Sequence, residues 1–254
     1  MCLILLAKNI HPDYPLIVAA NRDEFYKRPT ESAHFWEDHP YILAGRDLEK
    51  MGTWMGVTKY GQFAALTNYR DPEEMMEGKK SRGELVANFL KTGQSPETYL
   101  SEISQAPKDY PGYNLLVGNS EELFYFSNKE KQVRNVEKGI HGLSNHLFNT
   151  DWPKVKKGKE GLREILKYDQ SQTEMVKNLF GLLEYADPAS DEDLPQTGVP
   201  IEWERVLSPL FIKTENYGTR SSTVLLMSQK EIHFYEKVHD QSGTQENSFS
   251  VPVG

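Results

Sequence analysis

Cysteine is nearly absent from this sequence, whose 254 residues include a single one, Cys2. One cysteine excludes an internal disulfide and is typical of a reducing compartment, so a cytoplasmic location is expected. Long apolar runs are also missing. The first apolar run, residues 3–6, is far too short to span a membrane and lacks the basic start and cleavage site of a signal peptide. No membrane span is therefore expected.

Positive charge is in deficit. Asp and Glu number 37 against 29 Lys and Arg, which gives a formal net charge of −8 at pH 7. This balance argues against a nucleic-acid partner, and no basic patch overrides it. Repeats of fixed period, low-complexity tracts and linker-like segments are absent as well. With 38% hydrophobic and 26% charged residues the composition is that of a globular protein, and we expect residues 1–254 to form one domain.

The motifs of several common kinds of site are missing too. His34 and His39, like His141 and His146, stand five residues apart, which matches no usual zinc spacing, and there is no cysteine cluster. No glycine-rich phosphate loop follows a strand, and Gly-x-Ser-x-Gly is absent. A papain-like pair needs an internal nucleophile at the start of a helix, which Cys2 is not. Neither a metal nor a cofactor is expected.

The position of Cys2 is the most informative feature that is present. Its small size favours removal of Met1 by methionine aminopeptidase, which leaves a thiol and a free α-amine on one residue. These groups titrate at about 8.5 and about 7.7–8.0, so moving the proton from thiol to amine costs only about 1 kcal/mol. The amine then serves as general base for its own side chain, as in N-terminal-nucleophile hydrolases. The alternative is a small buried side chain at the start of a strand.

Short β-prone runs predict strands at residues 3–6, 15–20, 41–44, 52–58, 63–67, 113–118, 123–127, 140–143, 210–213, 219–227, 232–238 and near 249–251. Helices are expected after Ser81 and Ser171, each three residues before a glutamate, after Ser95, which precedes a proline, and after Asp151. The helix after Asp151 is basic. Its lysines are predicted to form a solvated face: Lys154, Lys156, Lys157 and Lys159.

Strands, two helices, strands, two helices and strands follow one another along the chain. Residues 26–40 are expected to be irregular, residues 45–47 to form a turn, and the acidic stretch 187–200 to be a loop or lid. Hairpins joined by pairs of helices favour an α+β arrangement in which antiparallel sheets carry helices on their outer faces.

Polar residues gather where several of these strands end. Taken singly, each has an ordinary explanation: Arg22 and Asp23 as an ion pair, Asn68 and Asn145 as turn residues, Arg220 as the partner of a surface carboxylate.

Taken together, these residue types suit nucleophilic catalysis. Either arginine could stabilise a thiolate by lowering the pKa of the Cys2 thiol. An asparagine amide is a neutral donor for the oxyanion of a tetrahedral intermediate, and Asp23 could orient the α-amine.

Motifs along most of the chain resemble those of the NRDE family, the transport-and-Golgi-organisation family. They are Ala-Ala-Asn-Arg-Asp-Glu-Phe at 19–25, Arg-Pro at 28–29, Phe-Trp at 35–36, Leu-Ala-Gly-Arg-Asp at 43–47, Gly-Thr-Trp-Met-Gly at 52–56, Ala-Ala-Leu-Thr-Asn-Tyr at 64–69, Arg-Gly at 82–83, Gly-Leu-Ser-Asn at 142–145 and Tyr-Gly-Thr-Arg-Ser-Ser-Thr-Val at 217–224. The resemblance implies a four-layer αββα sandwich of N-terminal-nucleophile hydrolase type, with two antiparallel sheets.

More distantly, the family is similar to cysteine acylases that cleave bile-salt amides and penicillin V. By motif, the acylase site falls on six residues: Cys2, Arg22, Asp23, Asn68, Asn145 and Arg220. The acylases separate their arginine and aspartate by two residues, whereas here the two are adjacent. Which of Arg22, Asp23 and Glu24 contacts Cys2 is therefore open.

Two functions follow from this resemblance. The first is a cysteine N-terminal-nucleophile amidohydrolase that cleaves a linear amide bond of an acylated small molecule. The alternative is a protein that binds or traffics haem or an acyl lipid without turnover. Retention of Met1 would block the amine and favour the alternative.

Overall fold

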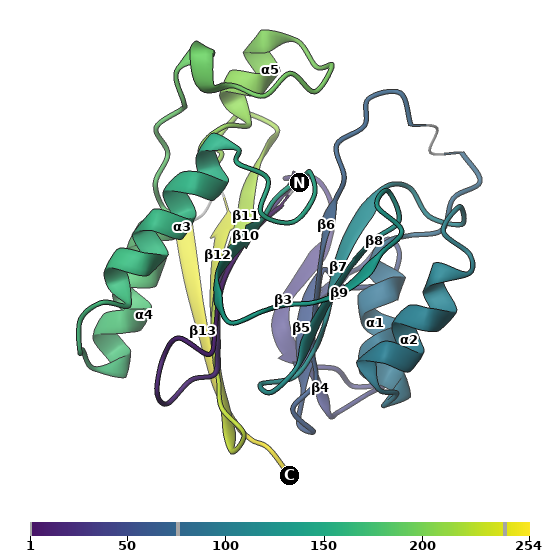
Figure 1. Ribbon diagram of the computed structural model, residues 1–254, viewed down its shortest axis with the longest axis vertical. Coiled ribbons are helices and arrows are strands. Elements are labelled where there is room, and N and C mark those ends of the chain that lie inside the picture. Colours follow the sequence, from purple (N-terminus) through teal and green to yellow (C-terminus); the bar gives the residue numbers. More distant parts are fainter. Residues whose placement is uncertain (1, 75–76, 241–242) are drawn as a thin grey trace.

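The computed structural model describes residues 2–74, 77–240 and 243–254; the expected removal of Met1 concerns a residue outside these ranges. Two antiparallel sheets face each other in Figure 1. The first sheet has the strand order β10 (Gly139–Leu143), β1 (Cys2–Lys8), β2 (Leu16–Phe25), β11 (Tyr217–Met227), β12 (Glu231–Asp240), β13 (Gly243–Pro252). The second has the order β3 (Thr30–Phe35), β4 (Ile42–Asp47), β5 (Met55–Thr58), β6 (Phe63–Asn68), β7 (Tyr113–Gly118), β8 (Leu123–Ser127), β9 (Val133–Asn135).

Helices cover the outer face of each sheet. On the second sheet, α1 (Gly83–Thr92) and α2 (Pro96–Ser104) pack against its central strands. On the first sheet, α3 (Pro153–Ile165) lies over β1 and β10, and α4 (Gln172–Leu183) lies over β2 and β11. A short helix, α5 (Ile201–Val206), follows the acidic loop. The four-layer αββα arrangement is thus confirmed.

Alternation along β1 and β2 explains how the layers form. Every residue of β1 is buried, because one face of the strand meets the second sheet and the other meets α3. Even-numbered side chains lie in the core between the sheets: Ile4, Leu6, Val18 and Ala20. Odd-numbered ones lie in the core beneath α3 and α4: Leu3, Leu5, Ile17 and Ala19. Burial of both faces is the reason that these strands are continuous apolar runs in the sequence.

Several predicted elements differ from the structure at the edges of the sheets. Residues 26–40 contain β3, an edge strand that buries Ala33 alone and so has no apolar alternation to reveal it. Residues 45–47, predicted as a turn, continue β4, and β9 and α5 were not predicted. Residues 210–213 are not a strand: Leu210 and Ile212 are buried by packing, with one isolated bridge between Lys213 and Gly218.

Two of the four predicted helix N-caps are confirmed and two are wrong. Ser171 forms the predicted capping box of α4, and the Ser95 side chain caps α2. Ser81 is wrong as a cap, because the N-cap residue of α1 is Arg82, with no side-chain cap. Asp151 is also wrong, because Trp152 is the N-cap residue of α3 and Pro153 begins the helix.

Candidate active site

The pairing of β1 with β2 places Cys2 directly opposite Arg22. By strand alternation both side chains belong to the face that looks toward the second sheet, whereas Asp23 belongs to the face beneath α3. Arg22 and Asp23 are neighbours in sequence but therefore act on opposite sides of the sheet. In this chain Arg22 and Asp23 are adjacent, unlike their counterparts in the acylases, and adjacent residues of a strand lie on opposite faces of the sheet.

A cavity of about 370 Å³ opens beside Cys2. Four of the predicted residues line it: Cys2, Arg22, Asp23 and Asn68. Its wall also includes Trp54 from the segment before β5, Arg82 from the start of α1 and Glu236 from β12. Elements far apart in the sequence thus contribute to one cavity at the ends of the two sheets.

Burial raises the pKa of the Cys2 thiol, and the carboxylate of Asp23 raises it further. The charge of Arg22 and a hydrogen bond from the Asp23 backbone N–H act in the opposite direction but do not outweigh burial. The expected help from an arginine is present, yet the thiol remains harder to ionise than in water. A nucleophilic role therefore requires a base that accepts the thiol proton.

Asp23 is 1% exposed, and its Oδ1 accepts a 2.8 Å hydrogen bond from the Thr219 hydroxyl on β11. Burial raises the pKa of this carboxyl, while the nearby charge of Lys154 lowers it. The carboxyl therefore has a hydrogen-bond partner on β11 and experiences the charge of a lysine on α3.

The two predicted asparagines lie close together but differ in their contacts. The Asn145 amide donates a 2.9 Å hydrogen bond to the backbone carbonyl of Asn68, and Asn145 is fully buried. Within the described part of the chain, no hydrogen bond engages the side-chain amide of Asn68, which lines the cavity. Of the two asparagines, only Asn68 lines the cavity.

Arg220 does not join the Cys2 cavity. It lies at a bulge of β11, between Thr219 and Ser221, and its Nη1 donates to the backbone carbonyls of Phe25, Tyr26 and Arg28 at 3.0, 3.0 and 3.1 Å. These contacts hold the turn that leads from β2 to β3.

Lys154 is the residue that the sequence patterns misplaced. It was predicted on a solvated face, yet it is 2% exposed, and burial lowers its pKa to about 8. Helical spacing could have revealed it, because Lys154, Gly158 and Leu162 stand four residues apart along the buried face of α3.

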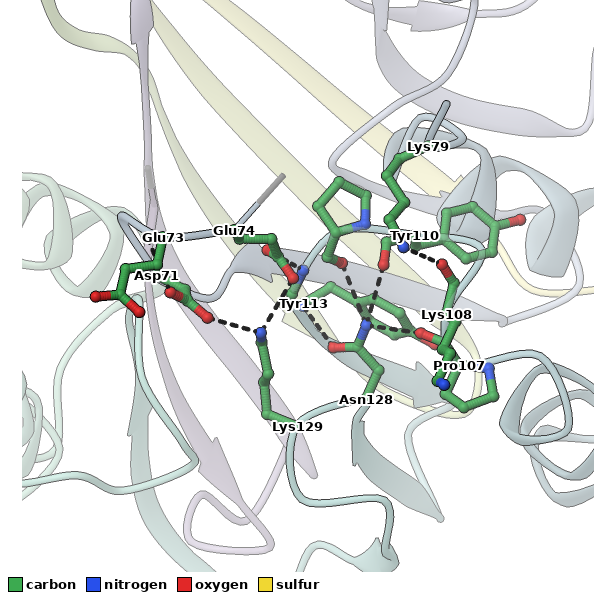
Figure 2. A network of polar contacts seen from close by, with 12 residues as sticks. Asp71, Glu73, Glu74, Lys79, Pro107, Lys108, Tyr110, Tyr113, Asn128 and Lys129 are labelled. Atoms are coloured by element: carbon green, nitrogen blue, oxygen red, sulfur yellow. Dashed lines mark hydrogen bonds and ion pairs between the residues drawn. The ribbon is translucent and has the colours of Figure 1, made fainter. Parts of the chain in front are cut away.

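The segment between β6 and α1 reaches the cavity and is braced by the polar network of Figure 2. The Lys129 ammonium contacts Asp71 at 2.9 Å and Glu74 at 3.0 Å, and the Lys79 ammonium donates to the Lys108 carbonyl. Asn128 accepts a 2.9 Å hydrogen bond from the Tyr113 N–H and donates to three backbone carbonyls: those of Pro107, Tyr110 and Pro111. Arg82 belongs to the same network, because its Nη1 donates to the Gly112 carbonyl at 3.0 Å and the Gly112 N–H donates to Glu74.

Within residues 2–74, 77–240 and 243–254, no group of three or more His, Cys, Asp or Glu residues is arranged to hold a metal ion. No helix in those ranges combines the length and apolar character that crossing a membrane requires.

Two facing antiparallel sheets between helix layers form an αββα sandwich of the N-terminal-nucleophile hydrolase type, which solved structures share. The C2A mutant of a conjugated bile acid hydrolase from Clostridium perfringens superposes with a TM-score of 0.53 at 12% identity, covering 98% of this chain and 92% of that one. A Caenorhabditis elegans ortholog of N-acylethanolamine-hydrolyzing acid amidase gives 0.52 at 10% identity, covering 89% and 92%.

Residues 1–241 match the family described as Transport and Golgi organisation 2, TANGO2, and the chain belongs to this family. The Transport and Golgi organization protein 2 homolog of Bos taurus is 33% identical over 250 residues, covering 89% of this chain and 88% of the relative. The Homo sapiens homolog is 32% identical over 249 residues with the same coverage. The resemblance noted from the motifs is thus confirmed.

Proposed function

We propose that this protein is a cysteine N-terminal-nucleophile amidohydrolase that cleaves a linear amide bond of an acylated small molecule. The observation that carries the proposal is the position of Cys2, at the start of β1 and opposite Arg22, beside a cavity that an unengaged Asn68 amide also lines. Nucleophile, cation and neutral donor are the parts that acyl transfer from an amide needs.

After removal of Met1, the Cys2 sulfur attacks the amide carbonyl and its proton passes to the α-amine of the same residue. Asn68 donates to the oxyanion of the tetrahedral intermediate, and Arg22 stabilises negative charge at sulfur. The amine then gives the proton to the departing nitrogen, which leaves a thioester on Cys2. Water attacks this thioester and the amine accepts one of its protons. The C–S bond then breaks, the carboxylic acid leaves, and the amine returns the proton to the Cys2 sulfur.

The other predicted residues support this arrangement, Asn145 and Arg220 from outside the cavity and Asp23 from its wall. Asn145 fixes the backbone of Asn68, and Arg220 holds the turn after β2. Asp23 lies beneath the start of β1, where it orients the amine.

Because burial raises the pKa of the Cys2 thiol, a nucleophilic role needs a base that accepts the thiol proton, and the proposal assigns that part to the α-amine of processed Cys2. The similar bile acid hydrolase also has a cysteine at its second position, since the solved chain is its C2A mutant. Its name describes hydrolysis of a conjugated bile acid, and that of the acid amidase describes hydrolysis of an N-acylethanolamine, which is an acyl amide as in the reaction proposed for this chain.

The test begins with the intact mass of the untagged protein, which shows whether Cys2 is the first residue. Release of p-nitroaniline from hexanoyl- and decanoyl-p-nitroanilide is then followed for the processed protein, for Cys2→Ser, and for a variant with one alanine added before Cys2. Both changes are expected to lower turnover at least 10²-fold, because one weakens the nucleophile and the other removes the free amine. Equal turnover in all three proteins would refute the proposal.

Binding of haem or an acyl lipid without turnover is the second candidate. It is favoured by burial of Cys2, which keeps the thiol protonated, beside a cavity that can still hold a ligand. Saturable binding of haemin or palmitic acid to a processed protein that hydrolyses neither anilide would support it. Absence of saturation would count against it.

A further inference from the structure

Lys154 is a charged side chain in an unfavourable place. It lies in the first turn of α3, where the partial positive charge of the helix N-terminus repels a cation. Its side chain is buried, and among the residues that the structure describes its Nζ has no hydrogen-bond partner. A buried lysine without such a partner destabilises a fold, so its location needs another explanation.

The packing of α3 directs Lys154 toward the start of β1. Gly158, one turn further along the same helical face, lies so close to Leu5 that an added Cβ would meet Leu5 Cδ2 at 2.6 Å. Lys154 lies about 6 Å earlier along the helix axis, over the core that α3 shares with β1 and β2. The charge of Asp23 has the largest charge effect on Lys154, and Cys2 acts in the same direction.

Other charged groups face Lys154 as well, namely Arg70 beyond β6 and Glu204 on α5. These two pair with each other, since Arg70 Nη1 lies 2.6 Å from Glu204 Oε2 and both side chains are buried. Their charges therefore largely cancel. The opposing charge that remains for Lys154 is the carboxylate of Asp23, immediately beyond the residue that pairs with Cys2.

We propose that Lys154 is a positioning residue of the site, whose charge opposes that of Asp23 and keeps the α-amine of processed Cys2 in its neutral, proton-accepting form. A protonated α-amine next to a buried ammonium is disfavoured by repulsion between like charges, whereas the neutral amine is not. The same charge favours the thiolate. A carboxylate alone would do the reverse, because it would stabilise the protonated amine and oppose the thiolate. Lys154 thus corrects the effect of Asp23 while leaving its orienting role intact.

This inference rests on the proposed function for its purpose, but its test does not require turnover. The α-amine is titrated by trace acetylation, followed by mass spectrometry of the N-terminal peptide, in a Cys2→Ala background where no thiol competes. Cleavage of an N-terminal ubiquitin-like fusion supplies chains that begin at residue 2. Lys154→Met and Lys154→Gln remove the charge, Lys154→Arg retains it, and Lys156→Met is the control on the exposed side of the same helix.

Both neutral variants are expected to raise the midpoint of amine acetylation by about one pH unit. The Lys154→Arg and Lys156→Met variants are expected to keep the midpoint of the parent protein. Equal midpoints in Lys154→Met and the parent would overturn the proposal. It would also be overturned if circular dichroism showed both neutral variants unfolded and the arginine variant folded, because the charge would then serve the fold. If the midpoint shifts in a protein that shows no amide turnover, the proposed effect of Lys154 on the amine stands and the proposed hydrolase activity is rejected.

Discussion

The Asn145 side-chain amide donates a 2.9 Å hydrogen bond to the backbone carbonyl of Asn68, joining the loop after β10 to the end of β6. A second contact runs between the same segments, from the Arg70 N–H to the Asn145 carbonyl at 2.7 Å. Asn145 therefore positions Asn68, and we expect replacement of Asn145 to affect stability and replacement of Asn68 to affect turnover.

Asn145→Ala is expected to lower stability, because it removes the buried partner of the Asn68 carbonyl at a cost of about 1–3 kcal/mol. Asn68→Ala is expected to leave stability nearly unchanged and to lower amide turnover about 10²–10³-fold, the usual effect of losing an oxyanion donor. Urea denaturation and anilide hydrolysis measure the two effects. The assignment of the oxyanion donor is wrong if Asn145→Ala remains stable and Asn68→Ala remains active.

Arg22→Gln is expected to slow alkylation of Cys2 by iodoacetamide at pH 7 and to move the midpoint of its pH profile upward. The reason is that the charge of Arg22 lowers the pKa of the thiol. Cys2 is the only cysteine, so total alkylation reports this residue alone. Arg28→Gln is a matched control, because Arg28 lines the same cavity but pairs with Asp47 at 2.6 Å. Identical profiles for both variants would contradict a specific role of Arg22.

Arg70 and Glu204 form a buried ion pair that attaches α5 and the acidic loop to the end of β6. The Arg70 guanidinium also stacks 4.7 Å from the centroid of Trp152. Arg70→Met and Glu204→Gln are each expected to lower the free energy of unfolding by about 3–5 kcal/mol, because each leaves a charge buried without its partner. The double variant is expected to lose less than the sum. Additive losses in urea denaturation would show that the two residues act independently.

The fold could be predicted where local signals and burial agree. β7 and β8 begin and end at the predicted residues, 113–118 and 123–127, because both are apolar runs buried on both faces. β3 escaped prediction because it is an edge strand whose pairing to β4 decides its structure, not its own sequence. Residues 210–213 were predicted as a strand and are not one. Their apolar side chains pack in the core, but their backbone forms only one isolated bridge.

The site could be predicted in its residue types but not in its geometry. The motifs indicated Arg22 and Asp23 together, yet only the alternation of β2 shows that they lie on opposite faces of the strand, Arg22 toward the second sheet and Asp23 toward α3, while both reach the cavity wall. Arg220 matches the family motif, but its side chain contacts backbone carbonyls instead of the Cys2 cavity. The bulge of β11 at this residue, which the sequence does not reveal, accounts for that position. Lys154 lies among four lysines of one helix, and only the packing of α3 distinguishes it from the exposed ones.

The burial of Lys154 predicts a dependence of stability on pH. Desolvation lowers its pKa in the folded protein from 10.5 to about 8, so between these pH values the unfolded chain binds more protons than the folded one. Stability rises with pH wherever that holds. The contribution of Lys154 is therefore fully unfavourable below pH 8, by on the order of 3 kcal/mol, and is relieved as pH rises toward 10.5.

Lys154→Met is accordingly expected to be more stable than the parent at pH 7, with a gain that shrinks as pH rises from 8 to 10. Urea denaturation of both proteins at pH 7, 8, 9 and 10 measures the difference, in which the titration of all other groups largely cancels. Lys156→Met, which changes an exposed lysine of the same helix, is expected to show no such trend. A constant difference between Lys154→Met and the parent across this range would mean that Lys154 titrates normally. A gain that shrinks would show that the fold gives up stability to hold a charge beneath Cys2, which a purely structural lysine has no reason to do.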